Sequence, residues 1–167
     1  MAKLLPICLF IAFGMWSCAG ANYSFSGTDT SGAQNFSVDY FKAQTPQASQ
    51  LFSQRLTESF KTLVQEQSPL DLTEGRGQLH YEGSITGYQI KPVAVEAGVT
   101  SSLNRLTVRM KVKYQNSLDP DKSFDKVFEE YTEYESSQDF FSIEESLWEE
   151  IFEKLGRSIY NESLGNW

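Results

Sequence analysis

Residues 103–115 read LNRLTVRMKVKYQ, and from Arg105 onward polar and apolar side chains alternate at every position. A period of two is typical of a β-strand with one buried face. The side chains predicted to face the core are Leu106, Val108, Met110, Val112 and Tyr114. The opposite face carries Arg105, Arg109, Lys111 and Lys113, and we predict that it is solvated.

A hairpin follows this strand. Residues 116–122 (NSLDPDK) contain Asp119-Pro120-Asp121, a typical turn signal, and residues 124–134 return as the partner strand. If the hairpin centres on Asp119, the facing pairs are Lys113 with Asp125, Arg109 with Glu129, and Arg105 with Glu133. Such pairs contribute about 0.2–1 kcal/mol each. We call Arg105, Arg109, Lys111 and Lys113 the basic row. It has two compatible interpretations, cross-strand charge pairing or an anion site for groups such as the phosphates of lipid A.

Other elements can be read outward from the hairpin. Residues 36–40 alternate as a short strand, and residues 79–95 form a longer one with a bulge expected near residues 83–87. Thr45-Pro46 is expected to start a helix that ends at Pro69. Ser142 is expected to cap a terminal helix that runs to about Leu164, with an apolar residue every four positions. We predict an α+β two-layer sandwich, with two helices on one face of a mainly antiparallel four-stranded sheet.

The first eighteen residues have the order of a secretory signal. Lys3 precedes ten apolar residues at 4–13, and small residues flank Cys18. Ten apolar residues are short for a helix that spans a bilayer. We interpret residues 1–17 as a signal peptide, Cys18 as the lipidated residue of a bacterial lipoprotein, 18–35 as a tether and loop, and 36–167 as one domain. An ordinary signal peptide with an incidental cysteine is the alternative.

Residues after Cys18 bear on location. Ala19 and Gly20 follow it, and no aspartate of the kind that retains lipoproteins in the inner membrane is present there. We expect the protein in the inner leaflet of the outer membrane, facing the periplasm. The whole chain has a net charge of −8, which argues against nucleic acid as a partner.

Catalytic patterns are scarce. His80 is the single histidine, and we interpret it as a solvated strand residue. The cysteines, Cys8 and Cys18, both lie near the N-terminus, so neither a zinc site nor a disulfide framework is expected. No phosphate-binding glycine loop and no nucleophile elbow occur. We therefore predict a protein that is not an enzyme and has no cofactor other than a covalent lipid at Cys18.

The order of several short motifs resembles the LptE family of lipopolysaccharide-assembly lipoproteins. They are YSFSG at 23–27, GSITGY at 83–88, KPVA at 91–94, LNRLTV at 103–108 and YTEY at 131–134, with NW at 166–167. The resemblance implies two helices on a four-stranded sheet, an LptD-like β-barrel partner and lipopolysaccharide as a ligand. It also makes Arg105, Arg109, Lys111 and Lys113 the candidate contact residues.

Three functions remain open at this point. The first is a lipoprotein subunit of the outer-membrane lipopolysaccharide translocon, which assists assembly of the LptD barrel and plugs it. The second is a periplasm-facing scaffold of another envelope complex. The third is a lipid carrier, which would need an apolar cavity between sheet and helices.

Overall fold

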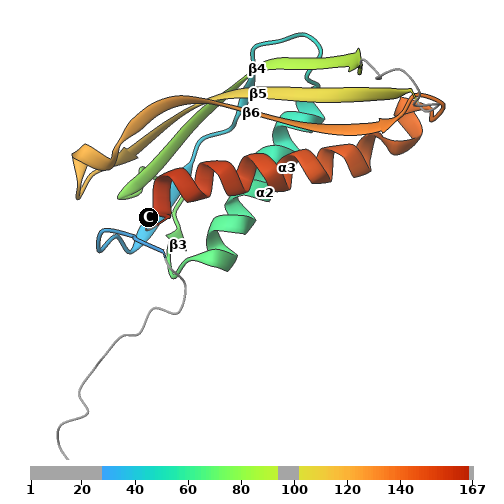
Figure 1. The fold of residues 1–167 in the computed structure, drawn as a ribbon. Coiled ribbons are helices and arrows are strands. Elements are labelled where there is room, and N and C mark those ends of the chain that lie inside the picture. Colours follow the sequence, from blue (N-terminus) through green and yellow to red (C-terminus); the bar gives the residue numbers. More distant parts are fainter. Residues whose placement is uncertain (1–27, 94–101, 166–167) are drawn as a thin grey trace, which may run out of the picture.

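The computed structural model describes residues 28–93 and 102–165 (Figure 1). The predicted signal peptide, the lipidation site Cys18 and the motifs at 23–27 and 166–167 lie outside these residues. The described elements are, in chain order, β1 (Asn35–Val38), β2 (Lys42–Ala43), α2 (Gln50–Gln67), β3 (Asp71–Leu72), β4 (Leu79–Pro92), β5 (Leu103–Asn116), a 3-10 turn (Pro120–Lys122), β6 (Phe124–Glu135) and α3 (Phe140–Leu164).

The sheet is mixed and has six strands, in the order β3-β1-β4-β5-β6, with β2 also paired to β4. Strands β4, β5 and β6 are long and antiparallel. The short strands β1, β2 and β3 pair in parallel, because α2 carries the chain back before it enters β4. The α+β class is confirmed, whereas the expected count of four strands is wrong, since two-residue strands such as β2 and β3 have no periodic pattern.

The hairpin and the bulge were predicted correctly. Strand β5 ends at Asn116 and β6 begins at Phe124, so the turn lies where the Asp-Pro-Asp signal indicated. The β4–β5 register shifts between Ile85 and Gly87, which places the bulge within the expected residues. This shift keeps Ile85 and Tyr88 both buried, although they are three residues apart.

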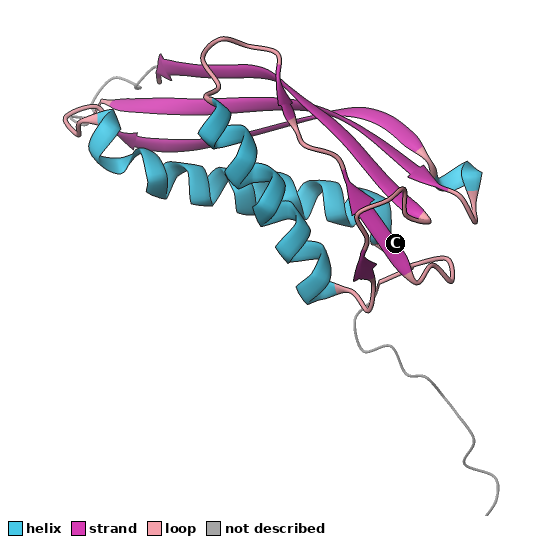
Figure 2. Cartoon of the chain, turned by 180° about the vertical axis from the view of Figure 1, so that it is seen from behind, coloured by secondary structure: helices cyan, strands magenta, loops and turns pink. Residues whose placement is uncertain are grey.

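Both helices lie on one face of the sheet, and the other face has no helix over it in the described part of the chain (Figures 1 and 2). Helix α2 begins after Ser49, whose hydroxyl accepts a hydrogen bond from the Phe52 N–H, and not after Thr45 as expected. Helix α3 begins after Asp139, whose carboxylate accepts from the Ser142 N–H. Ser142 is therefore inside the helix, and its predicted capping role is wrong, while the end at Leu164 is confirmed.

Aromatic side chains fill the space between the layers. The ring of Phe52 on α2 lies 5.2 Å from that of Tyr88 and 5.3 Å from that of Trp148, both edge-on. The Trp148 indole N–H donates to the Tyr88 hydroxyl at 2.9 Å. Deeper in the core, the Tyr81 hydroxyl donates to Ser163 of α3 at 2.9 Å. These contacts join β4 to both helices and satisfy the polar ends of buried rings.

Candidate binding surface

The helix-free face of the sheet is formed by alternate residues of β4, β5 and β6. The strand β5 contributes Arg105, Arg109, Lys111 and Lys113, as predicted from the alternation, while Leu106, Val108, Met110, Val112 and Tyr114 are buried on the helix side. Across the registers the same face carries the charged residues Glu82, Lys91, Asp125, Glu129 and Glu133. We call this surface the open face.

Ion pairs cross the open face from β5 to β6. The predicted register is confirmed, since Arg105 faces Glu133, Arg109 faces Glu129 and Lys113 faces Asp125. The Arg105 Nε donates to Glu133 at 2.9 Å, and the Arg109 Nε donates to Glu129 at 2.7 Å.

The third pair is different from the expected one. Asp125 is bound by the neighbouring Lys111 at 3.0 Å, whereas the Lys113 ammonium lies 3.7 Å from Glu82 on β4. A lysine side chain is long enough to reach a diagonal neighbour on the same face, and the register alone does not fix its partner. The row is therefore paired on both sides of β5.

Arg105 is held more tightly than the lysines. Its guanidinium lies 4.2 Å from the centre of the Tyr131 ring, in addition to its bond with Glu133. A guanidinium over an aromatic face gains a cation–π attraction of about 0.5–1 kcal/mol at an exposed site. The side chains of Lys111 and Lys113, about half exposed, are the more available cations.

His80 is not solvated, contrary to the prediction from the sequence. It is 6% exposed, and its Nδ1 lies 2.7 Å from the Ser37 hydroxyl, on β1. Ser37 also accepts the Gly77 N–H at 2.8 Å, so its remaining proton can be donated to His80. The burial of His80 results from the parallel pairing of β1 with β4, which puts Ser37 beside His80. This pairing was not predicted from the sequence.

The surroundings of His80 do not make a catalytic triad. Its Nε2 lies 3.5 Å from Glu82 and 3.7 Å from Asp39, and a hollow of about 680 Å³ opens beside it. Ser37 is 5% exposed and its oxygen is occupied by two hydrogen bonds, so it is poorly placed to attack a substrate. The cluster joins β1 to β4.

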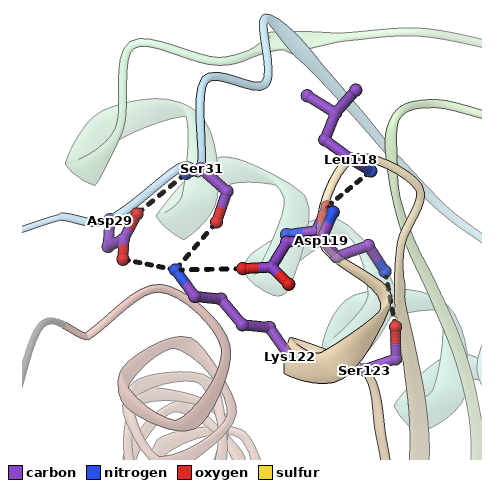
Figure 3. A network of polar contacts seen from close by, with 7 residues as sticks. Asp29, Ser31, Leu118, Asp119, Lys122 and Ser123 are labelled. Atoms are coloured by element: carbon purple, nitrogen blue, oxygen red, sulfur yellow. Dashed lines mark hydrogen bonds and ion pairs between the residues drawn. The ribbon is translucent and has the colours of Figure 1, made fainter.

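The described chain begins at one pole of the domain, beside the C-terminal end of α3. Thr28 bridges to Gly165, and the Asp29 N–H donates to the Leu164 carbonyl at 2.8 Å. Figure 3 shows Lys122 of the hairpin turn, with its ammonium 2.5 Å from Asp29 and 2.9 Å from Ser31. The hydrogen bond from Lys122 lowers the pKa of Asp29 below its ordinary value. The N-terminal segment is thus fastened at this pole.

A family model described as lipopolysaccharide-assembly (LptE) matches residues 33–163. The chain belongs to the LptE family. The match includes the three long strands, α2 and nearly all of α3, and it confirms the resemblance inferred from the sequence. Membership supports a role in lipopolysaccharide assembly and a place among outer-membrane lipoproteins.

Comparisons of structure concern the fold alone. A putative neuraminyllactose-binding hemagglutinin homolog from Helicobacter pylori is similar with a TM-score of 0.50 and 9% identity, over 79% of this chain and 83% of that one. A minor lipoprotein from Acinetobacter baumannii is similar with a TM-score of 0.46 and 13% identity, over 79% of this chain and 96% of that one. No curated protein sequence matches this LptE-family chain.

Two further findings limit the chemistry of the described residues. Within 28–93 and 102–165, no group of three or more histidine, cysteine, aspartate or glutamate side chains is arranged to hold a metal ion. No helix in that part of the chain is long and apolar enough to cross a membrane.

Proposed function

We propose that this protein is a lipid-anchored subunit of the outer-membrane lipopolysaccharide translocon, that it assists assembly of an LptD-like β-barrel and that it occupies the barrel lumen. The match of residues 33–163 to the LptE family carries the proposal. The open face supports it, because the lumen of a large barrel is polar and favours a charged, paired surface over an apolar one. Its role is binding, with no catalytic step.

The lipid anchor is proposed at Cys18. Cys18 and Thr28 are ten positions apart, so the tether reaches at most about 33–36 Å if fully extended. Because Thr28 is fastened beside Gly165, the pole with the ends of both helices and the β5–β6 turn would face the inner leaflet of the outer membrane. Mass spectrometry of the membrane fraction should find an acylated N-terminus at Cys18, and a Cys18→Ala protein should leave that fraction. An unmodified N-terminus elsewhere would refute the anchor.

The basic row is proposed to contact either lipopolysaccharide phosphates or acidic residues of the barrel. Reversing Arg109 and Lys111 to glutamate should weaken one of these contacts without unfolding the domain, because both side chains are more than half exposed. The matched control reverses Arg55 and Arg157, exposed arginines of the helix layer that are also in ion pairs. If both double variants had equal effects on lipopolysaccharide binding and on barrel capture, the basic row would have no specific role in either contact.

Depletion distinguishes the translocon from a scaffold of another complex. Loss of the protein should lower surface lipopolysaccharide and leave the barrel partner poorly assembled, and the barrel should co-purify with the protein after mild crosslinking. Normal surface lipopolysaccharide with a correctly folded barrel would make the scaffold the better account. A lipid carrier is disfavoured by the packing, since rings of Phe52, Tyr88 and Trp148 fill the space between sheet and helices.

A further inference from the structure

Strand β6 is the free edge of the sheet beyond β5 (Figure 1). Ser136, just after β6, donates its N–H to the Ser102 carbonyl. Because hydrogen-bonded pairs alternate along an antiparallel ladder, the even-numbered residues of β6 form their backbone hydrogen bonds with β5. The Tyr131 carbonyl instead accepts from Lys154 of α3 at 2.8 Å, outside the sheet. The register has no shift along β5–β6, so the odd-numbered residues direct their N–H and carbonyl groups outward.

The side chains of the same odd-numbered residues lie on the open face and alternate in character. Asp125, Glu129 and Glu133 are acidic, and between them Val127 and Tyr131 are 58% and 49% exposed. An exposed valine and tyrosine beside the outward backbone groups of residues 125–133 are costly to leave bare, because such an edge is a template for another strand. Along this edge an acidic side chain therefore occurs at every fourth position, and an apolar or aromatic side chain lies midway between each two.

Each carboxylate on this edge binds a cation of β5 through one of its two oxygens. Glu133 receives Arg105 on Oε1, Glu129 receives Arg109 on Oε2, and Asp125 receives Lys111 on Oδ2. The second oxygen of each carboxylate has no partner among the described residues. A carboxylate accepts several hydrogen bonds, so a cation on the outer side adds to the β5 cation and does not displace it.

A second copy of this chain fits the edge poorly. Two β6 strands side by side would bring carboxylates near carboxylates, and like charges across a strand pair are destabilising. On the helix side, the edge is flanked by Glu150, Lys154, Ser158 and Glu162 of α3, which bond to β6 residues. The helix flank therefore favours polar residues on the inner side of an added strand.

We propose that β6 accepts an extended segment of a partner protein as an added strand, and that this segment carries lysine or arginine at every fourth position with an apolar residue midway. Backbone hydrogen bonds to the outward groups supply affinity, and the acidic–apolar alternation supplies specificity. Lys154 occupies one of the outward acceptors and is displaced when the strand is added. The added strand would use the outward edge of β6, which borders the open face, and the proposal does not depend on the barrel-filling role.

The probe is a nine-residue peptide with the order basic, threonine, apolar, threonine, repeated, and ending on a basic residue. Amide hydrogen exchange of the purified full-length protein is followed by NMR with and without this peptide. The outward amides of Val127, Glu129, Tyr131 and Glu133 should exchange quickly alone and become protected with the peptide. Those of Phe128, Glu130 and Thr132 should be protected in both samples, because β5 already binds them.

Protein variants separate the backbone from the charges. Val127→Pro removes an outward N–H that the β5 ladder does not use, and should abolish peptide protection, whereas Val127→Thr keeps that N–H and should bind. Glu129→Gln with Glu133→Gln removes two charge pairs and should weaken peptide binding roughly two- to thirtyfold. The charge-matched control, Glu66→Gln with Glu149→Gln, changes two carboxylates in the groove between the helices and should bind normally.

Three results would overturn the proposal. The first is unchanged exchange of the outward amides at saturating peptide. The second is equal binding of a peptide in which every basic residue is replaced by glutamate. The third is protection of the same amides without peptide, if this protection increases with protein concentration. A second copy of the chain would then occupy the edge.

Discussion

Replacing Gly77 with alanine should destabilise the domain, because the new Cβ has no room. An ideal Cβ there would lie 2.7 Å from the Phe36 carbonyl carbon, 2.9 Å from the Phe36 Cα and 2.9 Å from the Ser37 nitrogen. Carbon atoms in contact are ordinarily about 3.5–4.0 Å apart, so the overlap is close to 1 Å with backbone atoms. Phe36 is fully buried on β1, between β3 and β4, and cannot retreat without moving the strand. Overpacking of this kind costs about 1–3 kcal/mol.

Gly75→Ala is the matched control two residues earlier in the same turn. A Cβ at Gly75 would meet nothing within 4 Å, so this variant should equal the natural protein or gain about 0.4–1 kcal/mol from the stiffer unfolded chain. Urea unfolding followed by circular dichroism measures the midpoint of each variant, with the slope expected to stay constant. The Gly77 variant should also shift the ring signals of His80, because the Gly77 N–H supports Ser37. Equal midpoints for the two variants would refute the packing of β1 on this turn.

Three other predictions concern the core, the N-terminal fastening and a buried tyrosine. Ile151→Ala should cost about 2–5 kcal/mol in urea unfolding, because Ile151 is fully buried, whereas Phe141→Ala, at an 80% exposed position of the same helix, should stay within about 0.5 kcal/mol. The pKa of Asp29 is lowered from its ordinary value of 3.8, so the bond to Lys122 is present above pH 3.8 and is lost as the pH falls below it. The protection factors of amides near residue 29 should therefore fall on acidification in the natural protein, but not in Asp29→Asn. Burial raises the pKa of Tyr88 to about 12, so tyrosinate absorbance from this residue should appear only near pH 12, and the stability of the domain should fall as pH rises above the ordinary tyrosine pKa of 10.

The antiparallel part of the fold was predictable because local patterns determine it. Strict alternation placed the buried and solvated faces of β5, and the Asp-Pro-Asp turn set the register with β6 to the residue. The apolar residue expected at every fourth position of α3 likewise marks its buried side, where Ile151 and Leu155 are fully buried. In each case the signal lies within one strand, one helix or the turn that joins two neighbouring strands.

Features that depend on distant residues were missed. The parallel pairing of β1 with β4 joins Ser37 to His80 across forty-three positions, and no local pattern in either strand indicates it. The helix starts were misplaced for a different reason, since Asp139 and Ser142 are both good caps and the sequence does not rank them. In the structure Asp139 is the cap, and the Phe140 ring that follows it lies 6.0 Å from the ring of Tyr134.

The open face is less positively charged than the basic row alone would indicate. Five cations of that face stand opposite four carboxylates, so the surface is nearly neutral in a chain of net charge −8. An anion that binds the β5 row must therefore compete with a carboxylate for its cation, whereas a cation that binds along β6 has a free carboxylate oxygen. Because Glu129 takes part in both, Glu129→Gln should strengthen phosphate contact through the released Arg109 and weaken capture of a basic strand. Opposite signs from one substitution separate the two uses of this face, and the same sign in both assays would show that Glu129 acts only by holding the sheet together.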